Sequence, residues 1–316
     1  MKAGLRVVIP DDYQNCLKSL ACFKSLSNHE VTIYHDTVTT LDAMVERFKD
    51  AQALVLTRER TKISKALLER LPNLKLICQT GKVSSHIDMD ACAAHGIQVD
   101  EGSGTGAATA ELTWALILAS RRHLVTEVLG LKQGAWQATL GQQLQGQCLG
   151  VWGYGRIGQQ VADYGRAFGM KVLVWGREAS AQAARKNGFE VAQSAQHLLR
   201  ESDVLSLHIR LNAETRGIVR PEHLAQMKTS ALLVNTSRAE LVQARALERA
   251  LQLGRPGFGA VDVFEEEPVL GANHPLIALP NALCTPHLGY VEHDNYERYF
   301  GIAFEQINAF AAKLNE

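Results

Sequence analysis

The glycine spacing near the middle of the chain can hold the phosphates of a dinucleotide. The motif is Gly153-Tyr-Gly155-Arg-Ile-Gly158. An apolar run at 148–152 precedes it, helical periodicity follows at 159–168, and a second apolar run at 171–175 closes a βαβ unit. The first glycine permits a tight turn, the second lets the backbone approach a pyrophosphate, and the third lets the helix pack on the strand. Free N–H groups and the dipole at the helix start would then hold the phosphates, so the stretch predicts a dinucleotide site.

Three later polar stretches have residue types that suit acid–base chemistry, and each follows a predicted strand. They are Asn235-Thr236-Ser237-Arg238, residues 262–268 and Thr285-Pro286-His287-Leu288-Gly289. Singly, each charged residue has an ordinary explanation: one of eleven histidines, a glutamate in a solvated run, an arginine in a surface ion pair. Ligands bind at the carboxyl ends of parallel strands, so three such stretches in succession predict a functional site.

The elements that must position these residues alternate between strand and helix. In the first hundred residues we expect strands at 5–9, 31–34, 53–56, 75–78 and 97–99, and helices at 16–26, 41–48, 65–71 and 89–94. A long helix is expected at 107–120. After residue 175, strands at 204–207, 231–234, 258–261 and 283–284 alternate with helices at 179–186, 195–200, 221–227 and 244–253, before a last helix at 292–314. This order predicts an α/β fold with two doubly wound parallel sheets.

Composition narrows the class of protein. A chain of 316 residues favours two domains, and 46% hydrophobic with 21% charged residues is typical of a soluble globular protein. Basic and acidic residues number 33 each, and without a polybasic tract we expect no nucleic-acid or membrane partner. We find no signal peptide or membrane-spanning run. Six scattered cysteines without a CxxC pair predict a cytoplasmic protein and no metal site.

The glycine motif and the three polar stretches together make the chain resemble the D-isomer-specific 2-hydroxyacid dehydrogenase family. The resemblance covers nearly the whole chain and keeps the family's order of motifs. It implies a Rossmann-type coenzyme domain at 104–287, inserted in a flavodoxin-like substrate domain made of 1–103 and 288–316, with the active site in a closing cleft between them. It also implies hydride transfer between a nicotinamide cofactor and a small D-2-hydroxy acid or 2-oxo acid, similar to glyoxylate and hydroxypyruvate or to 3-phosphoglycerate. A homodimer is the family's habit.

The resemblance assigns catalysis to Arg238, Glu267 and His287. The histidine would exchange a proton with the substrate oxygen, the glutamate would favour and orient the imidazolium, and the arginine would hold the substrate carboxylate. The resemblance also implies that the backbone N–H groups of Lys82 and Val83 bind the substrate carboxylate. Tyr290 departs from the family's pattern, and its position three residues after His287 predicts that its ring narrows the substrate pocket. The implied cofactor-binding residues are Gly153, Gly155, Arg156, Ile157, Gly158, Gly176, Arg177, His208, Thr236 and Asp262, although a structural role for His208 stays open. Arg58 and Arg60, before Thr61, either face the substrate or are solvated charges.

The second strand of the nucleotide-binding unit predicts the choice of cofactor. It ends Val174-Trp175-Gly176-Arg177-Glu178, with Gly176 where an NAD enzyme has an acidic residue for the ribose. The missing carboxylate and the adjacent guanidinium favour NADP. Two alternatives stay open: Glu178 could bind the ribose, and Arg177 could stack on adenine with either cofactor.

Two other functions compete with the dehydrogenase. The first is a dinucleotide-sensing scaffold, similar to the corepressors that share this fold, which would show little turnover. The second, formate dehydrogenase, is disfavoured because that branch pairs its histidine with glutamine, and this chain has Glu267.

Overall fold

The computed structural model describes residues 4–314, and the chain divides into two compact units. The first unit comprises Met1–Thr105 together with Glu292–Glu316, and the second comprises Gly106–Val291. Each unit is built on its own parallel sheet. The predicted α/β class with two parallel sheets is therefore confirmed.

The first unit has the flavodoxin-like strand order β2-β1-β3-β4-β5, with every neighbouring pair parallel. Its strands are β1 (Arg6–Ile9), β2 (Glu30–Ile33), β3 (Ala53–Leu56), β4 (Leu76–Gln79) and β5 (Gln98–Glu101). Its α-helices are α1 (Leu41–Phe48), α2 (Lys65–Leu68), α3 (Met89–Ala94) and α11 (His293–Leu314). Strands β3 and β4 are buried throughout, as expected for central strands covered on both faces.

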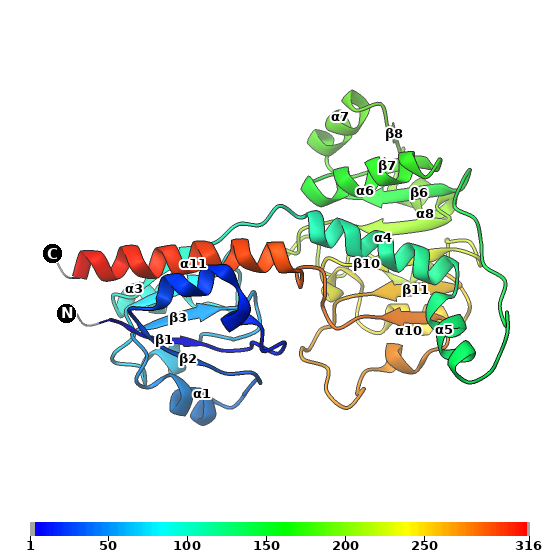
Figure 1. Cartoon of the computed structure of the whole chain (residues 1–316). Coiled ribbons are helices and arrows are strands. Elements are labelled where there is room, and N and C mark those ends of the chain that lie inside the picture. Colours follow the sequence, from blue (N-terminus) through cyan, green and yellow to red (C-terminus); the bar gives the residue numbers. More distant parts are fainter. Residues whose placement is uncertain (1–3, 315–316) are drawn as a thin grey trace. The chain divides into compact units, whose positions relative to one another are not determined.

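The expected α-helix at 16–26 is wrong. The segment forms two 3₁₀-helices, η1 (Leu17–Ser19) and η2 (Ala21–Leu26), because Leu20 between them is extended with ψ 140°. Glu297 on α11 fixes this break, since its carboxylate accepts hydrogen bonds from the backbone N–H groups of Ala21 and Cys22. Helix α11 lies along this unit, with Phe300 and Phe304 buried (Figure 1).

The second unit has the strand order β12-β11-β10-β9-β6-β7-β8, again wholly parallel. Its strands are β6 (Cys148–Trp152), β7 (Lys171–Trp175), β8 (Glu190–Val191), β9 (Val204–Leu207), β10 (Leu232–Asn235), β11 (Phe258–Val261) and β12 (Ala282–Cys284). Its helices are α4 (Ala107–Arg121), α5 (Leu124–Lys132), α6 (Arg156–Ala167), α7 (Glu178–Lys186), α8 (Ala195–Glu201), α9 (Pro221–Leu224), α10 (Ala246–Gln252), η3 (Ala239–Leu241) and η4 (Pro275–Ala278). Strands β6 to β11, the first six of this unit along the chain, have the Rossmann arrangement. The predicted Rossmann-type sheet is therefore confirmed.

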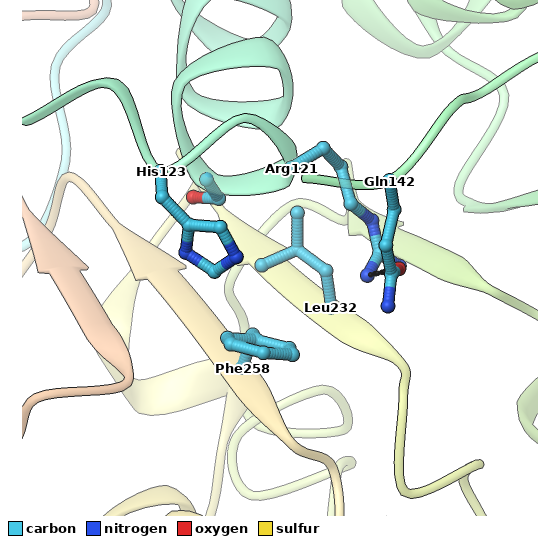
Figure 2. Close-up of a pocket in the computed structure, with 6 residues that line it drawn as sticks. Arg121, His123, Gln142, Leu232 and Phe258 are labelled. Atoms are coloured by element: carbon cyan, nitrogen blue, oxygen red, sulfur yellow. Dashed lines mark hydrogen bonds between the residues drawn. The ribbon is translucent and has the colours of Figure 1, made fainter. Parts of the chain in front are cut away.

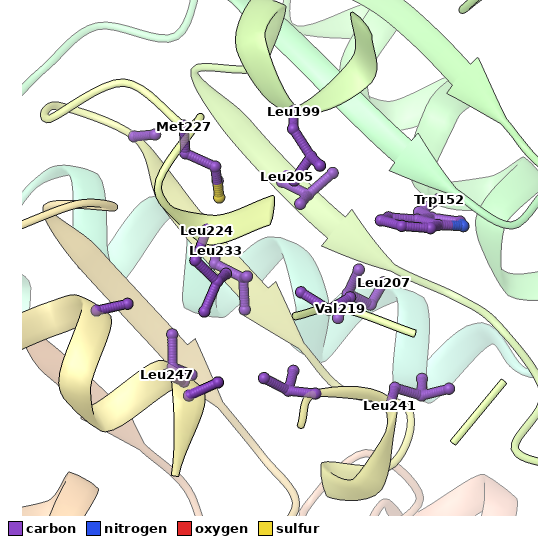
Figure 3. Packing of buried hydrophobic residues seen from close by; sticks show 14 of the residues in the cluster. Trp152, Leu199, Leu205, Leu207, Val219, Leu224, Met227, Leu233, Leu241 and Leu247 are labelled. Carbon is purple, nitrogen blue, oxygen red and sulfur yellow. The ribbon is translucent and has the colours of Figure 1, made fainter. Parts of the chain in front are cut away.

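Both faces of this second sheet are buried, because successive strand residues point to opposite sides and apolar side chains pack against them on each side. Leu205 and Leu207 pack with Leu233 and Leu247 in one core, which Figure 3 shows between α10 and the strands. Val204 and Val234 pack on the other face with residues of α4 and α6. Strand β6, which leads into the glycine motif, is thus packed on both of its faces.

A buried arginine fixes the C-terminal end of α4 to the sheet. Arg121 donates hydrogen bonds from Nη1 to Gln142 Oε1 (2.7 Å) and to the carbonyl of Ser230 (2.8 Å), and from Nη2 to the carbonyl of Asp203. Arg121, Gln142 and Phe258 are among the residues that line a cavity of about 10 Å³ (Figure 2). That volume holds at most one water molecule, so we assign the cavity a structural role.

Candidate active site

The turn between β6 and α6 has the geometry that its glycines predict. Gly153 has φ +99°, and a Cβ there would lie 2.4 Å from the carbonyl oxygen of His208. A Cβ on Gly158 would lie 2.1 Å from the carbonyl oxygen of Gly153, so the helix can approach only without a side chain. A Cβ on Gly155 would meet nothing within 4 Å. The open space beside Gly155, at the start of α6, fits a phosphate group held by backbone N–H groups.

His208 follows β9 and lies directly against this turn. Its backbone N–H donates to the carbonyl of Trp152 (2.7 Å), and its Nε2 forms a hydrogen bond with Ser206 Oγ (2.8 Å). Burial lowers the pKa of His208 to about 4. The ring is therefore neutral near neutral pH and offers no positive charge to a pyrophosphate. Its Nδ1 is buried and has no hydrogen-bond partner within residues 4–314, which leaves a polar atom for a ligand.

Arg177 is exposed at the end of β7, immediately before α7. The neighbouring Glu178 is engaged along its own helix: its Oε1 accepts from Gln182 Nε2 (3.2 Å) and Arg185 Nη1 (3.4 Å). Gly176 would place a Cβ 3.1 Å from Ser180 Cβ, so little room exists for a side chain there. The turn thus presents a guanidinium, while its one nearby carboxylate is directed along α7.

A histidine–glutamate pair follows β11 and β12, which are neighbours in the sheet. His287 Nδ1 donates to Glu267 Oε2 at 2.6 Å, and the two side chains are 22% and 26% exposed. The other glutamate oxygen, Oε1, accepts from the backbone N–H of Phe264 (2.9 Å). Because each carboxylate oxygen has its own donor, the glutamate is oriented, and His287 keeps Nε2 for proton exchange.

Asp262, at the end of β11, holds the loop that carries His287. Its Oδ1 accepts from Thr285 Oγ1 (2.6 Å) and from the N–H of Leu288 (2.7 Å), and its Oδ2 accepts from the N–H of Gly289 (2.8 Å). Asp262 is fully buried, and that burial raises its pKa, while the three donors oppose the rise. These bonds fix the backbone on both sides of His287, whose φ is +52°. Contact of Asp262 with a cofactor stays a prediction.

Arg238 lies in a turn that Asn235 organises after β10. Asn235 Nδ2 donates to the carbonyl of Arg238 (2.8 Å), and Asn235 Oδ1 accepts from the N–H of Ser237 (3.0 Å). Ser237 Oγ donates to the carbonyl of Leu207 on the neighbouring strand (2.7 Å). Arg238 Nη1 donates to the carbonyl of Ser237 (2.6 Å). Because β10 is the neighbour of β11, Arg238 and Glu267 follow adjacent strands at one edge of the sheet.

Two threonines of α4 that sequence reasoning missed link these loops. Thr113 Oγ1 forms a hydrogen bond with Thr236 Oγ1 (2.8 Å), and Thr109 Oγ1 donates to the carbonyl of Gly289 (2.7 Å). They are four residues apart and so share one helix face. A pair of threonines at that spacing in a mostly apolar helix was the available sign.

Tyr290 packs against the ring of His287. Its ring lies edge to face against the His287 ring, with centroids 5.3 Å apart and an interplanar angle of 79°. Tyr290 is only 5% exposed. The contact stabilises the orientation of the imidazole. Contact between Tyr290 and a substrate stays a prediction.

The loop expected to bind a substrate carboxylate follows β4 in the first unit, and a carboxylate of the chain lies in it. The N–H of Val83 donates to Glu101 Oε1 (2.6 Å), and Lys82 Nζ donates to Glu101 Oε2 (2.7 Å). Arg58, at φ +54°, lies against the same loop, since a Cβ on Gly81 would be 2.0 Å from its Nη1. Sequence reasoning did not identify Glu101.

Residues 4–314 contain neither a helix that could span a membrane nor a cluster that could hold a metal ion. No helix in this range has both the length and the apolar character needed to cross a membrane. Within the same range, no group of three or more histidine, cysteine, aspartate or glutamate side chains is arranged to hold a metal ion.

Comparison with known proteins gives a consistent family. The family description "D-isomer specific 2-hydroxyacid dehydrogenase, NAD binding domain" matches residues 114–289. A glyoxylate reductase from Aeropyrum pernix is 37% identical over 280 residues, which is 85% of this chain and 83% of that protein. A hydroxypyruvate reductase from Thermotoga maritima is 34% identical over 253 residues, covering 78% and 81% of the two chains. The crystal structure of a phosphoglycerate oxidoreductase from Vibrio cholerae o395 superposes with a TM-score of 0.95 at 50% identity, covering 98% of this chain and 99% of that one.

Proposed function

This chain belongs to the D-isomer-specific 2-hydroxyacid dehydrogenase family, and we propose that it interconverts a small 2-oxo acid and its D-2-hydroxy acid with a nicotinamide cofactor. The observation that carries the proposal is the 2.6 Å hydrogen bond between His287 Nδ1 and Glu267 Oε2. It combines an imidazole, a side chain that can give and take a proton, with a carboxylate that stabilises positive charge on that ring. It lies at the carboxyl edge of a Rossmann sheet, where that cofactor binds.

The residues divide the chemistry between them. The bound nicotinamide supplies the hydride that adds to C2 of the 2-oxo acid. His287 gives a proton from Nε2 to the carbonyl oxygen, which becomes the hydroxyl, and in the oxidation Nε2 takes that proton back. Glu267 stabilises the imidazolium. Arg238 binds the substrate carboxylate and stabilises the negative charge that develops on the carbonyl oxygen. Asp262 and Tyr290 keep the His287 ring in place.

A panel of 2-oxo acids tests this function. Glyoxylate, hydroxypyruvate and pyruvate are offered with NADH and with NADPH, and oxidation of 3-phosphoglycerate is measured in the reverse direction. Relatives named for glyoxylate, hydroxypyruvate and phosphoglycerate make these the first candidates. We expect a kcat above about 1 s⁻¹ with at least one acid. Tight dinucleotide binding without turnover on any acid would instead support a sensing scaffold.

We further propose that NADP is the preferred cofactor. Arg177 is exposed at the end of β7, where we expect the ribose of the adenosine half, and Gly176 has no carboxylate to repel a 2′-phosphate. Glu178 is hydrogen-bonded to Gln182 and Arg185, which disfavours its return to the ribose. Arg177→Ala should lower NADPH affinity roughly tenfold to a hundredfold and leave NADH affinity within about twofold. Equal losses with both cofactors would indicate stacking on adenine.

We propose a homodimer formed through an apolar surface made of α5 and the segment after it. The large apolar side chains of this surface are each at least 48% exposed: Leu124, Val125, Val128, Leu129, Leu131, Trp136 and Leu140. No residue of α5 is buried in the single chain. A patch of this kind marks an interface, and a second copy can match it through twofold symmetry. Leu131→Glu should yield a monomer by light scattering, whereas Leu253→Glu, at another exposed leucine, should not.

The proposed location is the cytoplasm. All six cysteines are free, which fits a reducing compartment. A small organic acid and a nicotinamide cofactor are both available there.

A further inference from the structure

The loop after β4 is an anion-binding loop that one of the chain's own side chains fills. Each oxygen of the Glu101 carboxylate has a separate donor: the backbone N–H of Val83 at 2.6 Å and the ammonium of Lys82 at 2.7 Å. Two donors converging on two carboxylate oxygens is the arrangement that recognises an organic acid. The internal carboxylate therefore shows what chemical class this loop accepts.

The backbone places Glu101 at this loop. Glu101 is the register partner of Gln79, the last residue of β4. The next N–H in the chain, that of Gly102, donates to the carbonyl of Gln79 (2.7 Å) and to that of Gly81 (3.1 Å). A Cβ on Gly102 would lie 2.8 Å from the carbonyl oxygen of Thr80, so only glycine allows this close approach. The position of Glu101 follows from main-chain bonds as well as from its own ion pair.

The surroundings of the loop favour any carboxylate. The guanidinium of Arg58 lies on the glycine of the loop, and the Arg58 N–H donates to Thr80 Oγ1 (3.0 Å). Arg58, against Gly81, and Lys82 thus bring two cations to this loop. The Glu101–Lys82 pair is accessible to a competitor, because the two side chains are 36% and 73% exposed. An exposed pair of this kind is held weakly.

We propose that Glu101 occupies the substrate-carboxylate position in the free enzyme, and that the 2-oxo acid displaces it. The inference rests on the proposed function, because it takes Val83 and Lys82 as substrate contacts. One carboxylate replaces another, so the donors stay satisfied while the Glu101 side chain moves into water. Glu101 therefore raises the KM for short 2-oxo acids by competing with them, and it keeps the loop ordered between turnovers.

Removing the charge of Glu101 tests this competition. In Glu101→Gln and Glu101→Ala we expect the KM for glyoxylate, at saturating cofactor, to fall about threefold to tenfold, which corresponds to loss of a weak exposed pair. Asp100→Asn is the matched control, since it removes a neighbouring charge that is bound to Gln98 and not to the loop. Its KM should stay within about twofold of the wild type, by the same scale.

The opposite sign would overturn the inference. If Glu101 only shapes the loop, Glu101→Ala raises the KM, and an unchanged KM would equally refute competition. A second readout is the dissociation constant of oxamate in the cofactor complex, measured by protein fluorescence, which should fall in Glu101→Gln by the same factor. Wild-type turnover with no fall in KM or dissociation constant defeats this inference alone. A wild type that neither reduces a 2-oxo acid nor binds oxamate defeats the proposed function as well.

Discussion

Replacing Glu267 by glutamine removes the charge from the histidine–glutamate pair and keeps its shape. The charged atoms are joined by a 2.6 Å hydrogen bond. For unit charges about 4 Å apart, the interaction is about 1 kcal/mol in water and about 4 kcal/mol at an effective dielectric constant of 20. Both side chains are about a quarter exposed, at 22% and 26%, so the lower part of this range applies. We therefore expect Glu267→Gln to raise the activation free energy by about 1 to 2 kcal/mol, which corresponds to a roughly fivefold to thirtyfold lower rate.

The assay is kcat for reduction of a 2-oxo acid at saturating cofactor and substrate. Positive charge develops on the His287 ring when it exchanges a proton, and Glu267 stabilises that charge, so kcat in Glu267→Gln should fall by the factor given above. The control is Glu266→Gln, which removes an adjacent exposed carboxylate and should not change kcat. An unchanged kcat in Glu267→Gln, or an equal fall in Glu266→Gln, would refute the electrostatic role of this pair.

Two further predictions concern residues around the pair and the cofactor turn. Arg238→Lys should lower kcat/KM by about a hundredfold in steady-state kinetics, because an ammonium cannot make the two-pronged contact with a carboxylate. An unchanged kcat/KM would show that Arg238 is only structural. Burial lowers the pKa of His208 to about 4, below its unfolded value of about 6.5, so the unfolded chain binds the extra proton first as pH falls. The contribution of the neutral His208 ring to the stability of the folded state is fully present above pH 6.5 and is lost as the pH falls toward 4. Between pH 7 and pH 4.5, the free energy of unfolding measured with urea should therefore fall by roughly 2 kcal/mol less in His208→Gln than in the wild type. Equal falls in the two proteins would contradict a buried neutral ring.

The sequence was sufficient where a local rule fixes the geometry. The spacing of Gly153, Gly155 and Gly158 predicted a turn whose close contacts with His208 the structure shows. Apolar runs predicted the central strands because parallel strands are buried on both faces. The pairing of His287 with Glu267 followed from the family resemblance, since the two residues are 20 positions apart and no local rule joins them.

What the sequence left out depends on partners far along the chain. The break at Leu20 depends on Glu297, and the link from Thr113 to Thr236 spans 123 positions. Helix α5 was missed because its apolar residues are spread around the helix, so the sequence shows no clear helical period there. Glu101 was missed because its contact with the loop after β4 follows from strand register, which places the end of β5 beside that loop.

The central claim is that His287 exchanges the proton with the substrate, and His287→Ala tests it most directly. Two quantities are measured on the same preparation: kcat/KM for reduction of the best 2-oxo acid, and the dissociation constant of the reduced cofactor from its fluorescence. We predict that kcat/KM falls about a hundredfold to ten-thousandfold, the usual loss for a positioned general acid, while the dissociation constant stays within about threefold. A variant that reduces the acid at nearly the wild-type rate would contradict the account.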